Sequence, residues 1–417
     1  MAADASALRL GGAHEPAVPI GLVSLAGCAF AGADLVPIGN RLIERVAADG
    51  QDAAALMDLS TVMQLVGDRA AAMAWQAKAL DVKRLYRRPP AVVCEDGIRL
   101  LAFLAPGDFM ANAPLEFLLE ESDVTLDMHF VLPGSPPAVG DRVPDHDLAF
   151  VAVGESDASR AVLHAVEDSV RSWPRPVLNR PERIALLSRD GVCALLRSVP
   201  GLAAPTSARI DREMLGTIGR GITRIDAVIA DGAFPIIARP VGSHAGDGLA
   251  RLDGAAAIAG YLSRQWEREF YVAPFVDYRG PDGMFRKYRI VLIEGRPFVC
   301  HMAISGNWMI HYLNAGMRES AGKRAEEARF MADFDHDFAR RHEHALRGMC
   351  ERIGLDYFGI DCGETPDGEL LLFEVDVAMI VHSMDPPDLF PYKAPQMRKV
   401  RDAFRAMLRR TCGRAVG

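Results

Sequence analysis

The sequence predicts a mixed α/β and α+β protein in which an N-terminal helical unit precedes an α/β layer and then a region rich in hairpins. Three observations predict this. Residues 20–86 show helical periodicity, residues 91–178 alternate buried strands with a helix, and residues 179–380 contain two strand pairs that turn at Glu294-Gly295 and at "PDG". A chain of 417 residues is long enough for two or three domains.

The N-terminal region, residues 1–90, is expected to be helical. The stretches "ADLVPIGNRLIERVAADG" and "DAAALMDLSTVMQLVGDRAAAMAWQAKAL" are amphipathic or alanine-rich, and the second is divided at Gly67-Asp68. Ala72, Trp75 and Ala79 resemble one tetratricopeptide-type unit, but such solenoids need about three repeats to bury a core. We therefore expect a surface for a protein partner or for a homodimer rather than a peptide-binding array.

Residues 91–180 are expected to form a parallel, doubly wound layer. The segments "IRLLAFLA", "LDMHFVLPG" and "LAFVAVG" predict buried strands, and "LEFLLEES" predicts a helix between them. Residues 181–417 form the third region, with a smaller subdomain at about 200–270. Here "ERIALLSRDGVCALLRSV", residues 323–353 and "APQMRKVRDAFRAMLRR" predict helices.

The composition limits the possible partners. The net charge of −8 argues against a general nucleic-acid surface. No apolar stretch approaches the roughly 20 residues of a membrane span. The 7 cysteines are scattered and contain no C-x-x-C pair, so neither a disulfide framework nor a zinc site is indicated. We expect a cytoplasmic protein that binds neither nucleic acid nor membrane.

A glycine-rich loop lies in "RPVGSHAGDGLARL", residues 239–252, directly after the apolar run "FPIIA". One interpretation is the tip of a long hairpin. The other is a loop whose N–H groups wrap a phosphate, with Arg239 supplying charge. The loop alone does not decide between them.

Two charged clusters follow. In "FRKYRIVLIEGR", Lys287 and Arg289 fall on one face of a strand, which suits either an anion or an exposed polar face. In "FEVDV", Glu374 and Asp376 also share a face, and Asp361 precedes them on the same hairpin. Oxygen ligands suit Mg²⁺ or Mn²⁺. The alternative is a strand end whose carboxylates form salt bridges with nearby arginines.

Glycine loop, basic strand and acidic hairpin, in this order, suggest nucleotide phosphates bridged by a metal ion. At these residues the chain resembles the ATP-grasp superfamily, which includes glutathione synthetase, D-alanine-D-alanine ligase and the ribosomal-protein glutamate ligases. The matching segments are "NRPERIALLSRD", "PIIARPVGSHAGDGLARL", "FYVAPFV", "KYRIVLIEGRPF" and "GIDCGETPDGELLLFEVDV". The resemblance implies a fold whose antiparallel sheets grip ATP.

The resemblance also implies roles for individual residues. Arg189 and Arg239 stand where relatives have nucleotide-contacting lysines, and Pro274 stands at an acidic position of the adenine hinge. Asp376 stands where most relatives have asparagine. The implied nucleotide-binding residues are Arg189, Arg239, Gly242, Ser243, Gly246, Gly248, Lys287 and the backbone of Ala273 and Phe275. The implied metal ligands are Asp361, Glu374 and Asp376.

Arg289 corresponds to an arginine that contacts the transferred phosphate or the acyl intermediate. Asn314, His301 and His311 are candidates for substrate recognition, although a histidine among apolar residues often has only a structural partner. The implied activity is an ATP-dependent carboxylate-amine (or thiol) ligase that acts through an acylphosphate with Mg²⁺. Two alternatives stay open: an ATP-grasp phosphotransferase, and a nucleotide-sensing interaction protein without catalysis.

Overall fold

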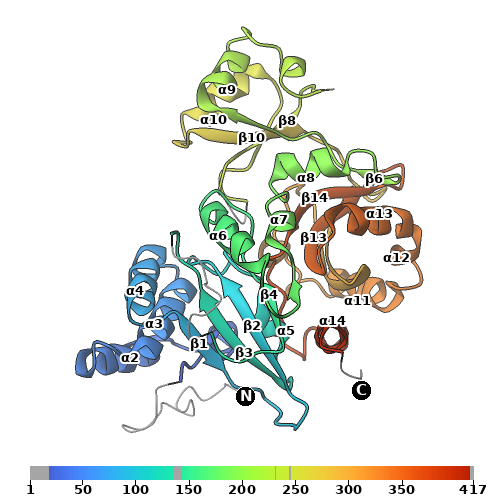
Figure 1. Cartoon of the computed structure of the whole chain (residues 1–417). Coiled ribbons are helices and arrows are strands. Elements are labelled where there is room, and N and C mark those ends of the chain that lie inside the picture. Colours follow the sequence, from blue (N-terminus) through green and yellow to red (C-terminus); the bar gives the residue numbers. More distant parts are fainter. Residues whose placement is uncertain (1–17, 135–142, 231, 244–245, 414–417) are drawn as a thin grey trace. The chain divides into compact units, whose positions relative to one another are not determined.

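The computed structural model describes residues 18–134, 143–230, 232–243 and 246–413 (Figure 1). The chain divides into two compact units. Unit 1 comprises residues 1–185, 355–358 and 377–417, and unit 2 comprises residues 186–354 and 359–376. Because each unit has its own sheets and core, the two are described separately.

Unit 1 contains a five-stranded sheet in the order β1-β3-β2-β4-β5. The strands are β1 (Leu85–Arg88), β2 (Ile98–Leu104), β3 (Val124–Phe130), β4 (Leu148–Val151) and β5 (Val177–Leu178). All neighbours are parallel except β1, which runs antiparallel to β3. Every residue of β4 is buried, as expected for a central strand covered on both faces. The predicted parallel layer is confirmed, with an antiparallel edge strand that the sequence did not predict.

The N-terminal helices of unit 1 are α1 (Leu22–Phe30), α2 (Val36–Ala48), α3 (Ala53–Leu65) and α4 (Arg69–Val82). The side chains of Asp52 and Asp68 cap α3 and α4 by accepting from the third backbone N–H of each helix. The phenol of Tyr86 on β1 donates to the carbonyl of Ala79 at 3.1 Å, which ties the sheet to α4. The helical prediction for this region is thus confirmed between residues 22 and 82 and wrong for residues 85–88, which form strand β1 because they pair with β3. The tetratricopeptide resemblance stays a prediction.

The remaining helices of unit 1 are α5 (Leu115–Leu118), α6 (Arg160–Val170), α7 (Pro181–Ile184) and α14 (Lys393–Thr411). The single helix predicted over residues 182–199 is wrong. It is divided into α7 and, in unit 2, α8 (Arg189–Leu196), because the Ser188 hydroxyl accepts from the N–H of Gly191 and starts a new helix.

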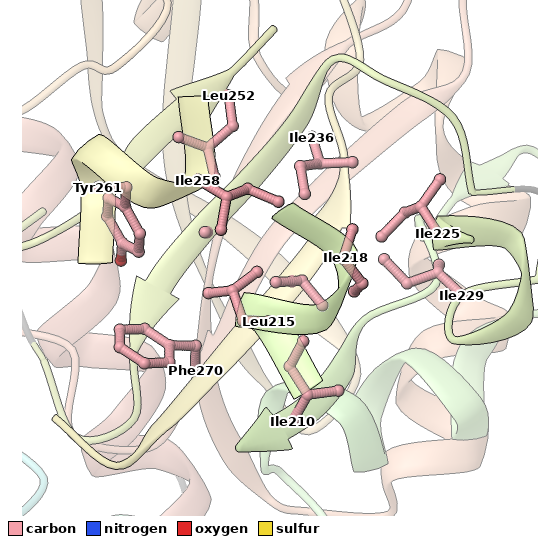
Figure 2. Packing of buried hydrophobic residues seen from close by; sticks show 12 residues of the cluster. Ile210, Leu215, Ile218, Ile225, Ile229, Ile236, Leu252, Ile258, Tyr261 and Phe270 are labelled. Atoms are coloured by element: carbon pink, nitrogen blue, oxygen red, sulfur yellow. The ribbon is translucent and has the colours of Figure 1, made fainter. Parts of the chain in front are cut away.

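Unit 2 begins its first sheet at residue 208, and all neighbouring strands in it are antiparallel. The order is β7 (Ala208–Asp211), β10 (Glu269–Pro274), β8 (Ile236–Pro240) and β9 (Ala250–Leu252). Helices α9 (Arg212–Gly219) and α10 (Ala255–Leu262) and the short 3-10 helix η2 (Ile225–Ala227) accompany the sheet. Leu215 and Ile258 of the two helices belong to one hydrophobic cluster with Phe270 of the sheet, and all three are fully buried (Figure 2). This small core gives the β8–β9 hairpin a rigid base.

The second sheet of unit 2 has the order β12-β11-β13-β14-β6. Its strands are β6 (Leu202–Ala203), β11 (Phe285–Ile293), β12 (Arg296–Ser305), β13 (Tyr357–Glu364) and β14 (Leu370–Asp376). Both predicted hairpins are confirmed. Glu294 and Gly295 have φ of 48° and 78° at the first turn, and Gly368 of "PDG" has φ of 83° at the second.

The predicted helix over residues 323–353 is wrong as a single element. The structure has α11 (Ala321–Asp333), α12 (Phe338–Arg341) and α13 (Glu343–Ile353). Where the helix is interrupted, the Phe334 and Phe338 rings stack at 5.7 Å, and Phe338 also packs on Tyr288 of β11 at 4.8 Å. A 3-10 helix, η3 (Tyr312–Asn314), lies before α11. In the part of the chain that the structure describes, helices long and apolar enough to cross a bilayer are absent.

Candidate functional site

A buried charge cluster connects β11 and β13 in unit 2. Lys287 and Arg289 alternate onto one face of β11, as predicted, and both contact Asp361. The Arg289 Nε and Nη2 donate to the two Asp361 carboxylate oxygens at 2.8 and 2.9 Å, and the Lys287 Nζ donates at 2.9 Å. The Asp361 side chain is only 5% exposed. The three ionised groups together carry one net positive charge.

These contacts fix the charge of the cluster. Burial alone would raise the pKa of Asp361, but the charges of Arg289 and Lys287 outweigh burial and hold that pKa far below its usual range. Burial would lower the pKa of Arg289, and the Asp361 carboxylate reverses this and raises it. Asp361 and Arg289 therefore stabilise each other's charged forms.

The second carboxylate of the cluster, Glu374 on β14, lies opposite Asp361 in the β13–β14 pair. It accepts a hydrogen bond from Arg189, the first residue of α8. A second nitrogen of the same guanidinium donates to the carbonyl of Phe373 at 3.1 Å. The structure thus shows Glu374 in a salt bridge with an arginine, which is the alternative that the sequence left open.

β-bulges occur next to both charged positions. The β13–β14 register shifts between Asp361 and Cys362, which makes Phe373 the extra residue on β14. The β11–β12 register shifts after Arg289, which makes Cys300 the extra residue on β12. Without the first bulge, regular pairing from Leu372 would put Glu374 opposite Ile360 rather than opposite Asp361.

The three predicted metal ligands share one face of the hairpin. Asp361 on β13 lies directly opposite Glu374 on β14, and Asp376 is two residues further along β14 with no bulge between them. They do not form a preformed metal site. Among the described residues, no three histidine, cysteine, aspartate or glutamate side chains are placed to hold a metal ion together. The physical reason is that the Asp361 and Glu374 oxygens are directed to basic side chains.

Arg239 of β8 lies at the base of the glycine loop, whose residues 244 and 245 are outside the described residues. Its guanidinium donates to the Ser243 carbonyl and, at 3.3 Å, to the Ser243 hydroxyl. That hydroxyl donates to the carbonyl of Pro240 at 2.9 Å. The loop joins the antiparallel strands β8 and β9, so it is the tip of a hairpin, as the first interpretation predicted. A hairpin tip can still bind a phosphate, so phosphate binding stays a prediction.

The glycines of this loop are required by the backbone. Gly242, Gly246 and Gly248 have φ of 77°, 80° and 65°. At Gly248 a Cβ atom would also lie 2.6 Å from Pro240 Cδ. The loop conformation therefore excludes other residues at Gly248 on two independent grounds.

Two guanidinium groups act on each other beside this loop. Burial, and then the nearby charge of Arg189, lower the pKa of Arg239 to about 10, while the Glu374 carboxylate acts in the opposite direction. Arg189 therefore bonds the Glu374 carboxylate and also has a second cation, Arg239, within range of its charge. A place where two cations repel each other is electrostatically suited to an anion.

The predicted adenine hinge is only partly supported by the backbone. The N–H of Phe275 donates to the carbonyl of Pro235 at 3.0 Å, and Ala273 is paired with Ile237. The Phe275 N–H is thus already bonded within unit 2, and the contact of the Ala273 and Phe275 backbone with adenine stays a prediction. The Phe275 ring instead packs edge-on against Trp308, with centroids 5.5 Å apart, and lies under the Arg251 guanidinium at 4.4 Å.

The histidine candidates lie near the basic pair. His301 is opposite Arg289 in the β11–β12 pair, and its ring packs on Tyr312 at 4.5 Å. Burial, together with the charges of Lys287 and Arg289, lowers the pKa of half-buried His311. Asn314 ends η3 and is exposed.

Sequence reasoning missed a buried carboxylate beside these histidines. The Tyr312 phenol donates to Glu327 Oε2 at 3.0 Å, and the N–H of Met302 donates to Oε1 at 3.0 Å. Glu327 is 0% exposed although it lies on the very polar helix α11. No pattern in the sequence distinguished it from the other charged residues of that helix.

Comparisons with known proteins give limited matches. No protein-family model matches, and no curated protein matches. VanG D-Ala:D-Ser ligase from Enterococcus faecalis matches with 13% identity and a TM-score of 0.46, over 75% of this chain and 100% of that chain. A RimK domain protein ATP-grasp from Sphaerobacter thermophilus matches with 18% identity and a TM-score of 0.39, over 75% and 98% of the two chains. D-alanine--D-alanine ligase from Bacillus anthracis complexed with ATP matches with 11% identity and a TM-score of 0.44, over 76% and 99%.

The fold agrees with the ATP-grasp expectation. This rests on the observed order of sheets, a parallel α/β sheet followed by an antiparallel sheet and a second sheet of two hairpins. TM-scores below 0.5 decide nothing about the substrates of this chain.

Proposed function

We propose that the chain is an ATP-grasp ligase that uses ATP to join a carboxylic acid to an amine or a thiol. One observation carries the proposal: unit 2 contains four basic side chains and two carboxylates in linked ion pairs, and one of the basic residues, Arg239, bonds the glycine hairpin loop. The basic residues are Arg189, Arg239, Lys287 and Arg289. Phosphoryl transfer depends mainly on positioning and on charge neutralisation, which such a set of residues can supply.

The proposed roles follow from position. Arg239 and Arg189 would hold the nucleotide phosphates, and the loop from Gly242 to Gly248 would approach them through main-chain N–H groups. Lys287 and Arg289 would orient the acid that is activated. ATP, when bound, would supply the phosphoryl group that converts this acid into an acylphosphate.

The need for Mg²⁺ or Mn²⁺ belongs to the same proposal. Carboxylate oxygens have the right chemistry for these ions, but here they are bonded to basic residues. The substrate class is likewise proposed only as an acid plus an amine or thiol. The matched ligases are named for D-alanine and D-serine, and these names do not define the substrates of this chain.

The decisive experiment follows products. Purified protein is incubated with ATP, Mg²⁺ and pools of acids and amines, and ADP, free phosphate and new masses are measured. A ligase gives ADP and phosphate in step with an amide or thioester, and added hydroxylamine traps the activated acid as a hydroxamate. Phosphate that remains on the acceptor would indicate a phosphotransferase, and nucleotide binding without turnover would indicate a sensor.

A further inference from the structure

One buried carboxylate fixes the residue that follows each of two candidate histidines. Glu327 of α11 is 0% exposed, and its Oε1 accepts a hydrogen bond from the Met302 N–H at 3.0 Å. Its Oε2 accepts from the Tyr312 phenol, also at 3.0 Å. Met302 follows His301 on β12, and Tyr312 follows His311 at the start of η3. Glu327 therefore ties the two chain segments that carry these histidines to the same point.

The β-bulge at Cys300 decides which face of the sheet His301 occupies. With the bulge, His301 lies directly opposite Arg289 in the β11–β12 pair. If the pairing beyond the bulge continued regularly, Arg289 would lie opposite Cys300 instead, and His301 would point to the other face. Side chains directly opposite each other on antiparallel strands have Cβ atoms about 4.5–5.5 Å apart, so the bulge brings the imidazole next to the guanidinium.

The Tyr312 ring holds the imidazole in this place. The rings of Tyr312 and His301 pack with centroids 4.5 Å apart and planes at 42°. Because the phenol donates to a carboxylate that is itself fixed on α11, the Tyr312 ring cannot swing away from His301 without breaking that bond. The contacts run from a buried helix position to the charged face of the sheet, in the order Glu327, Tyr312, His301 and Arg289.

The edge of the sheet alone does not account for a carboxylate at this position. β12 is an edge strand, so its outward N–H groups need acceptors, and Glu327 satisfies that of Met302. One neutral acceptor would suffice for this task, whereas burying a carboxylate costs free energy unless bonds compensate it. The second oxygen is used by Tyr312, which is only partly buried. The carboxylate therefore serves the segment after β12 as well as the edge of the sheet.

We propose that Glu327 is a positioning residue of the proposed ligase site, which acts through Tyr312 to keep the His301 imidazole beside Arg289. There the imidazole donates an N–H to the acid that Arg289 orients, so that donors from two neighbouring strands hold the acid. The inference rests on the proposed function and adds to it the part of the chain that fixes how the acid lies.

The test compares three variants of the full chain, each of which changes one bonded group. Tyr312→Phe removes only the hydroxyl that reaches Glu327. Glu327→Gln keeps the size of the side chain but leaves one acceptor oxygen for two donors. Tyr288→Phe is the matched control, because the Tyr288 phenol donates to Glu364 Oε2 at 3.0 Å on the face of β11 opposite to that of Arg289.

The first readout is the NMR signal of the His301 ring in protein that carries isotope-labelled histidine, assigned by its loss in His301→Gln. The Tyr312 ring lies against this imidazole and shifts its signal by the ring current. Tyr312→Phe and Glu327→Gln should therefore move the signal, because both release the aromatic ring from its anchor. Tyr288→Phe should leave the signal in place.

The second readout is the hydroxamate formed from the acid pool in the presence of ATP, Mg²⁺ and hydroxylamine. We expect kcat to fall about 10-fold in Tyr312→Phe and in Glu327→Gln, because a misplaced acid loses its orientation for the reaction. KM for ATP should stay unchanged, since the proposed nucleotide contacts come from other residues. Tyr288→Phe should change neither constant.

The double variant shows whether the two residues act as one unit. Tyr312→Phe combined with Glu327→Gln should be no slower than the slower single variant, because both changes break the same connection. Losses that multiply would contradict the inference. If Glu327→Gln does not fold, Tyr312→Phe carries the test alone, since it deletes one hydroxyl from a partly exposed residue.

The inference is overturned if the His301 signal stays in place in the folded variants, or if Tyr288→Phe lowers hydroxamate formation as much as Tyr312→Phe does. The second result would indicate a general loss of packing. Failure of the proposed function is distinct, because the wild type would then give neither ADP nor hydroxamate. A moved His301 signal would still confirm in that case that Glu327 fixes the imidazole.

Discussion

Each unit contains a buried aspartate held by two basic residues, and comparing them shows what a charge cluster does and does not indicate. In unit 1, Asp123 accepts from Arg405 at 2.5 and 2.8 Å and from Arg409 at 3.0 Å, and the Cys94 thiol donates to it at 3.4 Å. In unit 2, Asp361 has the same two-pronged arginine and a second cation. Local geometry alone does not separate the two.

The surroundings do separate them. Arg405 and Arg409 are four residues apart on α14, so the unit 1 cluster attaches the C-terminal helix to the segment before β3. The unit 2 cluster has a second carboxylate opposite the first, two further arginines (Arg189 and Arg239) and a glycine loop. A buried ion pair is therefore weak evidence for a site, and several ion pairs together with a glycine loop are stronger evidence.

The largest expected effect is on stability. Asp361→Asn leaves Lys287 and Arg289 buried without their counter-charge and should lower the free energy of unfolding by about 3–5 kcal/mol. Asp123→Asn should cost less, about 1–3 kcal/mol, because Arg405 can turn to water from a side chain that is already 35% exposed. Urea denaturation of both variants measures this, and equal losses would contradict the proposed difference between the units.

The second prediction concerns ligand binding. Arg239→Ala should weaken ATP binding by about 1.5–3 kcal/mol, the usual strength of a hydrogen bond to a charged group. Arg405→Ala removes an arginine of the unit 1 cluster and should leave ATP affinity unchanged. Calorimetry decides, and loss of affinity in both variants would show that the effect is not specific to the glycine loop.

A third buried aspartate, Asp58 in unit 1, differs from the other two because it accepts hydrogen bonds from backbone N–H groups. Asp58 is 1% exposed and accepts from the N–H groups of Ile20 and Gly21 at 2.7 and 3.1 Å. Burial raises its pKa from the ordinary 3.8 to about 7. The folded state therefore holds this proton more tightly than the unfolded state, so stability should fall as the pH rises from about 4 to 7.

Asp58→Asn tests this directly. Relative to the variant, the wild type should lose about 3 kcal/mol of unfolding free energy between pH 4 and pH 7. Urea denaturation of both proteins at pH 5, 6 and 7 provides the comparison. A pH dependence that is identical in the two proteins would show that Asp58 does not titrate in this range.

The smallest expected effects come from the second cation of each cluster. Lys287→Gln and Arg409→Gln leave the two-pronged arginine in place, so each should lower the unfolding free energy by about 1 kcal/mol or less. The two variants should differ in ligand binding, since only Lys287 belongs to the proposed nucleotide site. ATP titrations that weaken with Arg409→Gln and not with Lys287→Gln would reverse the assignment of the two units.

Local patterns in the sequence predicted much of this structure. The hairpins around Glu294-Gly295 and "PDG" carry their own turn signals, and alternation correctly placed Lys287 with Arg289 on one face. The short strands β1, β7 and β9 were missed, because their only support is pairing with distant segments. The long helices were overextended, since a capping serine and a group of phenylalanines interrupt them without a glycine or proline.

The site was predictable as a set of residues and not as a set of bonds. Arg189 and Glu374 are 185 positions apart, and no pattern in either segment predicts that they pair. Carboxylates expected to hold a metal are instead bonded to the arginines and lysine expected to hold phosphate. The family resemblance assigned each group an external ligand, and salt bridges between the carboxylates and arginines were only the alternative. Physical chemistry requires each buried charge to be compensated in the absence of ligands as well.

The bulge at Phe373 has a consequence for the evolution of this site. The extra residue supplies the carbonyl that Arg189 uses, and its ring packs on Tyr278 at 5.0 Å over Gly363, where a Cβ atom would lie 3.0 Å from the Phe373 ring. A chain shortened by this one residue would still align Asp361 with Glu374 but would lose that carbonyl. Three features should therefore be gained and lost together among homologous sequences: the arginine at 189, the glycine at 363 and the inserted residue at 373. The length of β14 would then follow the presence of this salt bridge as closely as the identity of the charged residues does.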